Sequence, residues 1–372
     1  MKANQTLDPI GTICFLPNDN LKEIIPTLRE TASILDGTWK ILIVSVESSN
    51  SQMSFKEIKR YCRDFSLIDN LIIKKGVEFQ KVVPFAFKVL SAINFVKTPY
   101  ISFFSSYQKP HFKCLADLAN VLLDNPSVGA INAEVSVLGQ KKQCNDRARC
   151  QFFDNEQGIK EFGLRRFGVY GTLYNIPILK KNSILERFEH ALRAHVHYPG
   201  IYLNIMLAAN CKTAVTSNVI SEENIDRRNC GKISDYFTKH SYGQRCDQLI
   251  ALRNALFESF MDLQKRLKLK DFPIKNFYYS YVQLSTVLLN KMIRENEKIY
   301  GEQMMGIEIT AKSFGIFCIG AVEQFPDYTS FQEDLKKSIF YKIDNIIKDA
   351  REIDKEWNAG PENNELSFFS SR

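Results

Sequence analysis

The chain has 372 residues, of which 45% are hydrophobic and 24% charged, and this balance is ordinary for a protein with a sizeable core. Its net charge of +7 suits anionic ligands or an acidic membrane surface but is too small to indicate a nucleic-acid partner. The nine cysteines lack paired or metal-type spacing and therefore predict reduced thiols. The N-terminal sequence MKANQTLDPIG has no apolar signal segment, and no apolar run is long enough to predict a transmembrane helix. We expect a cytoplasmic protein, with peripheral contact at the inner face of the membrane left open.

The first third of the chain alternates short apolar runs with helical patterns. The runs predicted as strands cover residues 11–16, 39–46, 67–74, 100–104 and 128–135. Between them, apolar residues three or four positions apart predict helices over 21–34, 56–65, 80–95 and 111–123. Strands that are apolar on both faces and separated by helices predict an α/β fold, with a parallel sheet covered by helices on both sides.

The strand Tyr100–Phe104 carries the clearest sign of a binding site. It is apolar and aromatic, and it ends abruptly in Ser105, Ser106 and Tyr107. Polar clusters also follow the three strands that precede it. Because parallel strands end at the same edge of a sheet, these clusters would gather where open α/β sheets bind ligands. The alternative is a set of ordinary surface turns.

In the order and spacing of their segments, residues 10–222 resemble the GT-A fold of family 2 nucleotide-sugar glycosyltransferases. The matching segments are Leu16-Pro17-Asn18, Val44–Ser49, Lys75-Gly76, Thr98–Phe104, Phe167–Leu179 and Leu203–Lys212. The resemblance implies a GT-A-like, mostly parallel sheet flanked by helices. It also implies transfer of a sugar from a nucleotide-sugar donor to a hydroxyl of a glycan or a lipid-linked glycan.

The resemblance further implies which residues bind the two substrates. The donor contacts would be Pro17, Asn18, Glu47, Lys75, Gly76, Ser105 and Tyr107. Glu47 stands where the family has an Asp that contacts the nucleotide base, and a carboxylate can accept a hydrogen bond from a pyrimidine N–H or a ribose hydroxyl. Gly171 and Thr172 resemble the acceptor-side turn. For each of these residues, ordinary turn or loop chemistry is the alternative.

The first departure from the family concerns metal binding. The family's fourth strand ends in Asp-x-Asp, whose carboxylates hold a divalent cation on the sugar diphosphate. Ser105, Ser106 and Tyr107 stand there instead, and hydroxyls alone do not replace two carboxylates as ligands for Mg²⁺ or Mn²⁺. We therefore expect no metal cofactor bound through this motif.

A different positive charge would then have to face the diphosphate. The best candidates are Arg147, Arg149, Arg165 and Arg166, with Lys141 and Lys142 behind them. A guanidinium group suits this role because it binds phosphate oxygens through two parallel hydrogen bonds. The alternative is that these arginines are solvated loop charges.

The second departure concerns the catalytic base. Inverting members of the family carry a Glu-Asp pair where this chain has Pro199 and Gly200. His195 and His197 lie just upstream, and a histidine that titrates near neutral pH could accept the proton of the acceptor hydroxyl. Glu186 and Glu189 are alternative bases. Structural or surface histidines are the simpler interpretation.

The pattern changes after residue 222. Helical patterns over 234–264, 277–300 and 331–357 predict a helical accessory domain over 223–357, and the polar residues 358–372 predict a disordered tail. The accessory domain would pack on the core, form a homodimer, or contact anionic lipid through its basic amphipathic helices.

Two other functions stay open from the sequence alone. Since both carboxylate motifs are absent, the chain could be a non-catalytic, degenerate transferase that binds nucleotide or glycan, or that scaffolds a partner enzyme. It could also be a metal-free transferase whose donor carries a single phosphate.

Overall fold

The computed structural model describes residues 9–17, 24–47, 56–62, 65–74, 85–137, 149–164, 169–181, 183–192, 199–223, 242–273, 275–277 and 279–281, with positions 337, 341, 344, 345 and 348. The chain divides into two compact units, Met1–Tyr236 with His240–Phe272, and Phe237–Lys239 with Pro273–Arg372. Every strand and helix labelled below belongs to the first unit. That unit extends past the boundary expected at residue 222, and the division into domains 1–222, 223–357 and 358–372 stays a prediction.

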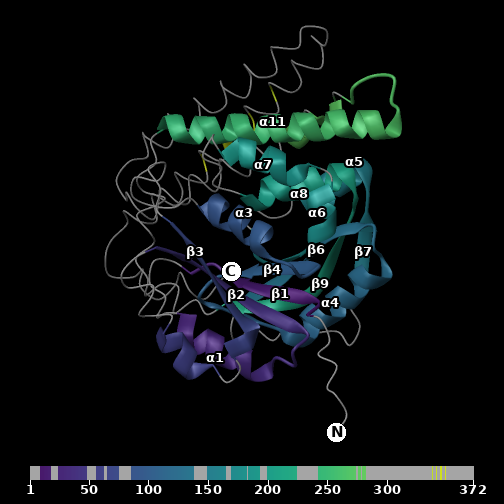
Figure 1. Ribbon diagram of the computed structural model, residues 1–372. Helices are drawn as coiled ribbons and strands as arrows, with labels where there is room; N and C mark the ends of the chain where they lie inside the picture. The colour runs from purple at the N-terminus through teal and green to yellow at the C-terminus, as the bar shows by residue number, and fades with distance from the viewer. Residues whose placement is uncertain are drawn as a thin grey trace. The chain divides into compact units, whose positions relative to one another are not determined.

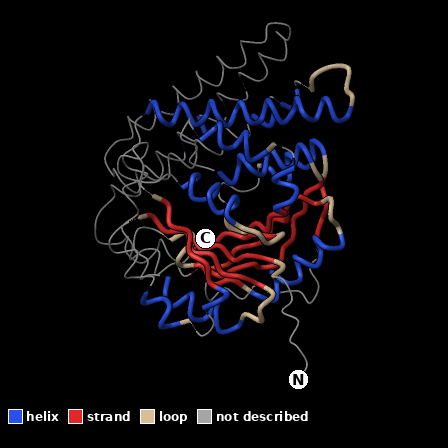
Figure 2. Tube along the Cα trace, in the orientation of Figure 1, coloured by secondary structure: helices blue, strands red, loops and turns tan. Residues whose placement is uncertain are grey.

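A mixed sheet of nine strands lies at the centre of the first unit (Figures 1 and 2). The strands are β1 (Gly11–Phe15), β2 (Trp39–Val46), β3 (Ile68–Ile73), β4 (Tyr100–Phe104), β5 (Gln108–Pro110), β6 (Val128–Val137), β7 (Cys150–Phe153), β8 (Thr172–Asn175) and β9 (Lys212–Glu223). Their order across the sheet is β3-β2-β1-β4-β8-β6-β9-β5, and β7 also pairs with β9. The α/β class and the five strands predicted from the sequence are confirmed.

The strands β1 to β4 form the parallel half of the sheet. Phe15 of β1 lies opposite Ile43 of β2 and Phe104 of β4, and β2 pairs in parallel with β3. Phe15, Ile43 and Phe104 are all fully buried. The strands β1 and β4 are buried along their whole length because helices cover the sheet on each side.

The sequence predicted a parallel sheet, but the other half of the sheet contains antiparallel strands. The short strand β8 runs antiparallel between β4 and β6, and β5 and β7 run antiparallel to β9. The predicted strand at 128–135 therefore pairs with β8 and β9 rather than with its predecessor β4. Even so, β1, β2, β3, β4, β6 and β9 all run in one direction. We call the edge where these strands end the carboxyl edge, and the opposite one the amino edge.

Helices cover both faces of the sheet (Figure 1). They are α1 (Ile25–Ile34), α3 (Phe85–Phe95), α4 (Phe112–Asp124), α5 (Asn155–Gly158), α6 (Ile176–Lys181), α7 (Ile184–Leu192), α8 (Pro199–Asn210) and α11 (Tyr242–Leu267), with helical turns at residues 56–61, Phe65–Leu67 and Ile159–Gly163. The helices α1 and α4 lie on one face, and α3, α6, α7 and α8 on the other. No described helix is both long enough and apolar enough to cross a bilayer.

The core on the α1 face shows why these segments are helices. In α4, Leu115, Leu118 and Leu122 recur at spacings of three and four residues, and all three are fully buried. Together with Leu28 of α1, they pack in one cluster that includes Phe15 of β1. The apolar stripe read from the sequence is thus the face that each helix turns to the sheet.

A polar cluster joins α11 to the helices on the other face. One Asp262 carboxylate oxygen accepts hydrogen bonds from the Arg187 guanidinium at 2.8 Å and from the Asn210 amide at 3.0 Å. The Tyr202 hydroxyl donates to the Arg187 carbonyl at 3.1 Å, and burial raises the pKa of Tyr202. These contacts link α7, α8 and α11, so α11 packs with the sheet-containing unit.

Candidate functional site

The connections between strands determine where the sheet can hold a ligand. The chain moves from β1 through β2 to β3 with its helices on the α1 face, where Ile58 of the turn at 56–61 joins the core cluster. It then returns past β1 to β4 through α3, on the opposite face. In open α/β sheets, ligands bind at such a reversal, outside the carboxyl ends of the strands, here those of β1 and β4.

Pro17 and Ser105 flank this reversal. The amide of Leu16 donates to the Phe104 carbonyl at 2.9 Å, so the chain leaving β1 is joined to the end of β4. Pro17 and Ser105 are the next residues on the two strands. Two donor contacts expected from the sequence therefore lie side by side at the carboxyl edge.

The turn after β4 is held by its own hydrogen bonds. The Ser105 amide donates to the Gln108 side-chain oxygen at 3.0 Å, and the Tyr107 amide donates to the Ser105 hydroxyl oxygen at 3.3 Å. The Thr27 hydroxyl of α1 donates to the Ser106 carbonyl at 3.1 Å. Ser106 is only 1% exposed, and its hydroxyl has no hydrogen-bond partner among the described residues. The turn is thus held in a fixed conformation, with the Ser106 hydroxyl buried in it.

These hydroxyls do not fit the divalent cation that the family resemblance implies. Mg²⁺ and Mn²⁺ are held by carboxylate oxygens, which carry charge, whereas Ser105 and Ser106 offer only neutral ligands. Within the described part of the chain, no three His, Cys, Asp or Glu residues gather closely enough to bind a metal ion.

Glu47 also lies at the carboxyl edge. It follows β2, its amide donates to the Ile73 carbonyl at 2.8 Å, and its side chain is exposed. The strand order places β1 between β2 and β4, so Glu47 and Ser105 lie on either side of Pro17. An exposed carboxylate at this position is accessible to a ligand that crosses the strand ends.

The two acceptor-side candidates have different environments. Gly171 precedes β8 at the carboxyl edge and has φ = 80°, a left-handed conformation that only glycine adopts without strain. Thr172 is fully buried, and its hydroxyl donates to the Asn132 side-chain oxygen. Thr172 therefore holds β8 against β6, and its side chain is turned away from solvent.

Arg149 does not join the group around Pro17 and Ser105. It precedes β7, whose first residue Cys150 pairs with Thr216, partway along β9 and short of its carboxyl end. Its side chain is exposed. As alternative bases, Glu186 and Glu189 are likewise exposed on α7. The candidates Asn18, Lys75, Gly76, Arg147, Arg165, Arg166, His195 and His197 lie outside the described residues.

Sequence reasoning missed a buried lysine at this edge. Lys88 of α3 is 8% exposed, and its ammonium nitrogen Nζ donates to the Pro17 carbonyl at 3.5 Å. A lysine in a helix is usually solvated, so the sequence analysis assigned no role to Lys88. The signal was present, because Lys88 is the single charged residue in the helical segment FAFKVLSAINF.

A carboxylate at the end of β9 was also missed. The backbone of Glu223 pairs with that of Gln108, whose side chain accepts the hydrogen bond from Ser105. Burial raises the pKa of Tyr170, and electrostatic interactions with Cys14 and Glu223 raise it further. Tyr170 packs its ring on Phe85 of α3 at 5.8 Å. A negative group thus lies beside the turn that lacks carboxylates, and the β-branched run KTAVTSNVISEE could have predicted its strand.

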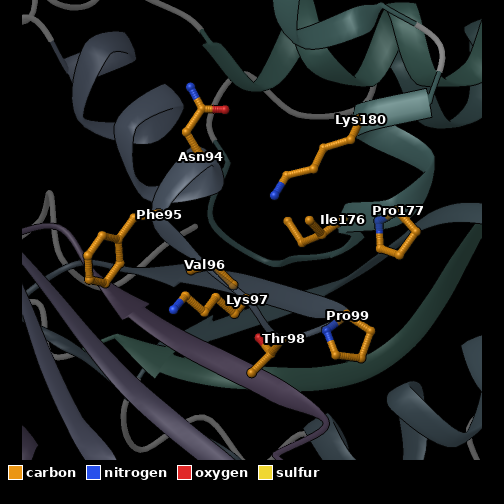
Figure 3. Close-up of a pocket in the computed structure, with 9 residues that line it drawn as sticks. All are labelled: Asn94, Phe95, Val96, Lys97, Thr98, Pro99, Ile176, Pro177 and Lys180. Atoms are coloured by element: carbon orange, nitrogen blue, oxygen red, sulfur yellow. The ribbon is translucent and has the colours of Figure 1, made fainter.

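The structure outlines a cavity of about 490 Å³ at the amino edge (Figure 3). It is lined by Asn94, Phe95, Val96, Lys97, Thr98, Pro99, Ile176, Pro177 and Lys180. Lys97 and Lys180 are exposed, and the Lys180 ammonium group lies above Ile176. Because Thr98 and Pro99 precede β4 whereas Ser105 follows it, this cavity is separate from the candidate site.

No family model matches the sequence, and no curated protein is similar to it. The solved structures that it resembles include nucleotide-sugar glycosyltransferases. Against S. aureus TarS 1-349 in complex with UDP-GlcNAc, identity is 10%, coverage is 88% of this chain and 92% of that chain, and the TM-score is 0.49.

Two further structures show a comparable likeness. For the mannosyltransferase PcManGT from Pyrobaculum calidifontis with GDP-Man and Mn²⁺, identity is 10%, coverage is 92% of this chain and 88% of that chain, and the TM-score is 0.40. For glucosyl-3-phosphoglycerate synthase from Mycobacterium tuberculosis with Mn²⁺, UDP and glucosyl-3-phosphoglycerate, identity is 10%, coverage is 65% of this chain and 80% of that chain, and the TM-score is 0.38. Since all three TM-scores are below 0.5, the case for a function rests on this chain's own residues.

Proposed function

We propose that the chain is a glycosyltransferase that moves a sugar from a nucleotide-sugar donor to a hydroxyl of a glycan or a lipid-linked glycan. The observation that carries the proposal is the convergence of Pro17, Glu47 and Ser105 at the carboxyl edge, around the reversal between β1 and β4. All three are donor contacts expected from the sequence, and they come from three separate strands. Open α/β sheets bind nucleotides at such a place.

In the proposed complex, the donor lies across the strand ends. Glu47 accepts a hydrogen bond from the base or the ribose, while Tyr107 stacks on the base or the sugar. Ser105 donates its hydroxyl to a phosphate oxygen. Asn18, Lys75 and Gly76 complete the donor side, and Gly171 shapes the acceptor side. Arg147, which precedes β7 in the chain, is the arginine expected to face the diphosphate.

The proposed reaction needs a base for the acceptor. His195 or His197 takes the proton of the acceptor hydroxyl, the hydroxyl oxygen bonds to the anomeric carbon, and the bond from that carbon to the phosphate oxygen breaks. Both histidines fall between α7, which ends at Leu192, and α8, which begins at Pro199. Because Tyr202 of α8 donates to the Arg187 carbonyl of α7, the two ends of that segment are held together.

The proposal includes a cytoplasmic location and no step through a metal held by an Asp-x-Asp motif. It assigns the helical region after residue 223 to packing on the core, to a homodimer, or to contact with the inner face of a membrane. Acceptor binding at a membrane would suit a lipid-linked substrate.

A second candidate is a non-catalytic protein that binds nucleotide or glycan, or that scaffolds a partner enzyme. The observation in its favour is the hydroxyl turn, Ser105 to Tyr107, where the resembled family has metal-binding carboxylates. Function depends on the site rather than on the fold, so the missing carboxylates count against catalysis.

Titration calorimetry separates the two candidates. The full chain is titrated with UDP, GDP, ADP, CMP and their sugar forms, first with Mn²⁺ and then with EDTA. We expect one nucleotide to bind and to remain bound in EDTA, whereas binding to none of them overturns the proposal.

A transfer assay then tests the base. His195→Ala or His197→Ala should lower sugar transfer by about 100-fold or more, the usual contribution of a general base. Wild-type rates in both variants would eliminate the histidines. Nucleotide binding with neither transfer nor hydrolysis of the bound sugar nucleotide would favour the second candidate.

A further inference from the structure

We infer that Lys88 supplies the positive charge that holds the donor's diphosphate at the carboxyl edge. This inference rests on the proposed function and specifies how the donor binds without the Asp-x-Asp metal. It starts from the position of the Lys88 ammonium group, 3.5 Å from the Pro17 carbonyl oxygen.

The burial of Lys88 is unusual for a lysine. Ala86 and Val89, its neighbours on α3, are fully buried, and Leu90 is nearly so. Among the described side chains, Lys88 is the only lysine or arginine that is buried. Moving an ammonium group out of water costs on the order of several kcal/mol, unless charged or polar groups compensate for the lost hydration. Lys88 therefore places a positive charge in a poorly solvated part of the carboxyl edge.

The Lys88 ammonium lies where the diphosphate would cross the sheet. Pro17 follows β1, and the hydrogen bond from Leu16 to Phe104 places it beside the end of β4. The Lys88 ammonium group donates to the Pro17 carbonyl at the long end of the hydrogen-bond range. A phosphate oxygen at the reversal between β1 and β4 would be within reach of the same group.

Low solvent exposure makes this charge more effective. An ion pair in a poorly solvated site is several times stronger than the same pair in water. A preorganised cation also stabilises the charge that develops on the departing diphosphate. The exposed Arg149 and Lys109 lack this advantage.

The test compares ligands that differ only in their phosphates. The affinity of the full chain is measured in EDTA for a nucleoside, its monophosphate and its diphosphate, using the base that the wild-type protein prefers. Lys88→Met keeps the length of the side chain but removes its charge. We expect diphosphate affinity to fall about 10- to 100-fold, as for lost hydrogen bonds to a charged group, while nucleoside affinity stays unchanged.

The matched control is Lys97→Met. Lys97 lies just after the end of α3 and is exposed at the amino edge. Removing its charge should therefore leave all three affinities unchanged. Lys88→Arg keeps the charge and should retain more diphosphate affinity than Lys88→Met. Thermal unfolding confirms that each variant is folded before it is titrated.

The outcomes are distinct. If the wild-type chain binds no nucleotide, the proposed function fails; if it binds and Lys88→Met keeps full diphosphate affinity, only the inference fails. An equal loss for nucleoside and diphosphate would show that Lys88 merely positions Pro17, and this also overturns the inference. If Lys88→Met does not fold, the two affinities of the wild-type protein are measured at increasing salt concentration. The inference predicts that diphosphate affinity weakens more steeply than nucleoside affinity. Equal salt dependence of the two affinities contradicts the inference.

Discussion

The two edges of the central sheet hold lysines in opposite environments. At the amino edge, Lys97 and Lys180 are exposed beside a cavity of about 490 Å³, whereas at the carboxyl edge Lys88 is buried against Pro17. Water and salt screen an exposed ammonium group, so its attraction for an anion is weak. The solvent exposure of a lysine, rather than the size of the nearest cavity, therefore indicates where a phosphate would bind.

The two edges of the sheet also differ in the residues that pack there. At the amino edge, Trp39 packs over Gly11 and meets Phe112 edge-on at 6.3 Å, so that edge closes the core. At the carboxyl edge, polar residues such as Glu47 and Ser105 follow the strands. Changes at the amino edge should therefore affect stability, and changes at the carboxyl edge should affect ligand binding.

The largest expected effect comes from Gly11→Ala at the amino edge. A Cβ atom added there would lie 2.4 Å from a ring carbon of the buried Trp39, too close for any side chain. We expect the free energy of unfolding to fall by about 3 kcal/mol, at the upper end for overpacked cores, when measured by urea denaturation. Nucleotide affinity of the folded protein should not change. Wild-type stability, or intact stability with lost affinity, would contradict the assignment of this edge.

A smaller effect is expected from two glycines with positive φ, one at each edge. Gly171→Ala and Gly37→Ala both place a Cβ in the left-handed region, at φ = 80° and 91°, and each should cost roughly 1–2 kcal/mol. Gly37 has open space around it and serves as the control. Only Gly171→Ala should also lower sugar transfer, and equal transfer rates in the two variants would remove the turn from the site.

Next in size is the effect of Glu47→Gln. Loss of a charged acceptor for the base or ribose should lower nucleoside affinity about fivefold, or ~1 kcal/mol, by calorimetry. Glu30→Gln is the matched control, since Glu30 is exposed and pairs with Lys109. If the two variants bind the nucleoside equally well, Glu47 is an ordinary loop residue.

The smallest effect belongs to Asp36 in the turn before β2. Burial would raise the pKa of its carboxyl, but hydrogen bonds from the Thr38 hydroxyl at 2.6 Å and the Thr38 amide at 2.9 Å hold that pKa below its ordinary value. The carboxylate therefore stabilises the fold above the unfolded pKa of about 3.9, and this contribution is lost as the pH falls through the lower, folded pKa.

Asp36→Asn should consequently reduce stability at pH 7 by less than about 1 kcal/mol, because Asp36 is exposed. The difference from wild type should shrink below pH 4, as followed by urea denaturation at several pH values. A difference that grows in acid would mean that the hydrogen bonds do not favour the ionised form.

The sequence predicted the parallel half of the sheet because its strands carry their own signals. Trp39–Val46 is predicted and found with the same bounds, since a continuous apolar run buried on both faces needs no tertiary information to be recognised. Strands of three or four residues, such as β5 and β8, show no period and take their conformation from their neighbours. Their insertion is what makes the sheet mixed.

The candidate site was predictable only where a strand end defines it. Pro17, Glu47 and Ser105 follow strands that the sequence shows, so their common edge could be inferred. Lys88 could not be placed in the same way, because its burial depends on how α3 packs against the sheet. The buried, internally bonded hydroxyl of Thr172 likewise depends on Asn132, forty residues away in the chain.

Hydrogen–deuterium exchange tests the central claim most directly, since it reports both edges in one experiment. On addition of the nucleotide that binds most tightly in EDTA, the account predicts slower exchange at Leu16, Glu47 and the turn from Ser105 to Tyr107. Exchange at Asn94 to Lys97 and at Lys180, around the amino-edge cavity, should not change. Protection at the amino edge with none at the carboxyl edge would contradict the account.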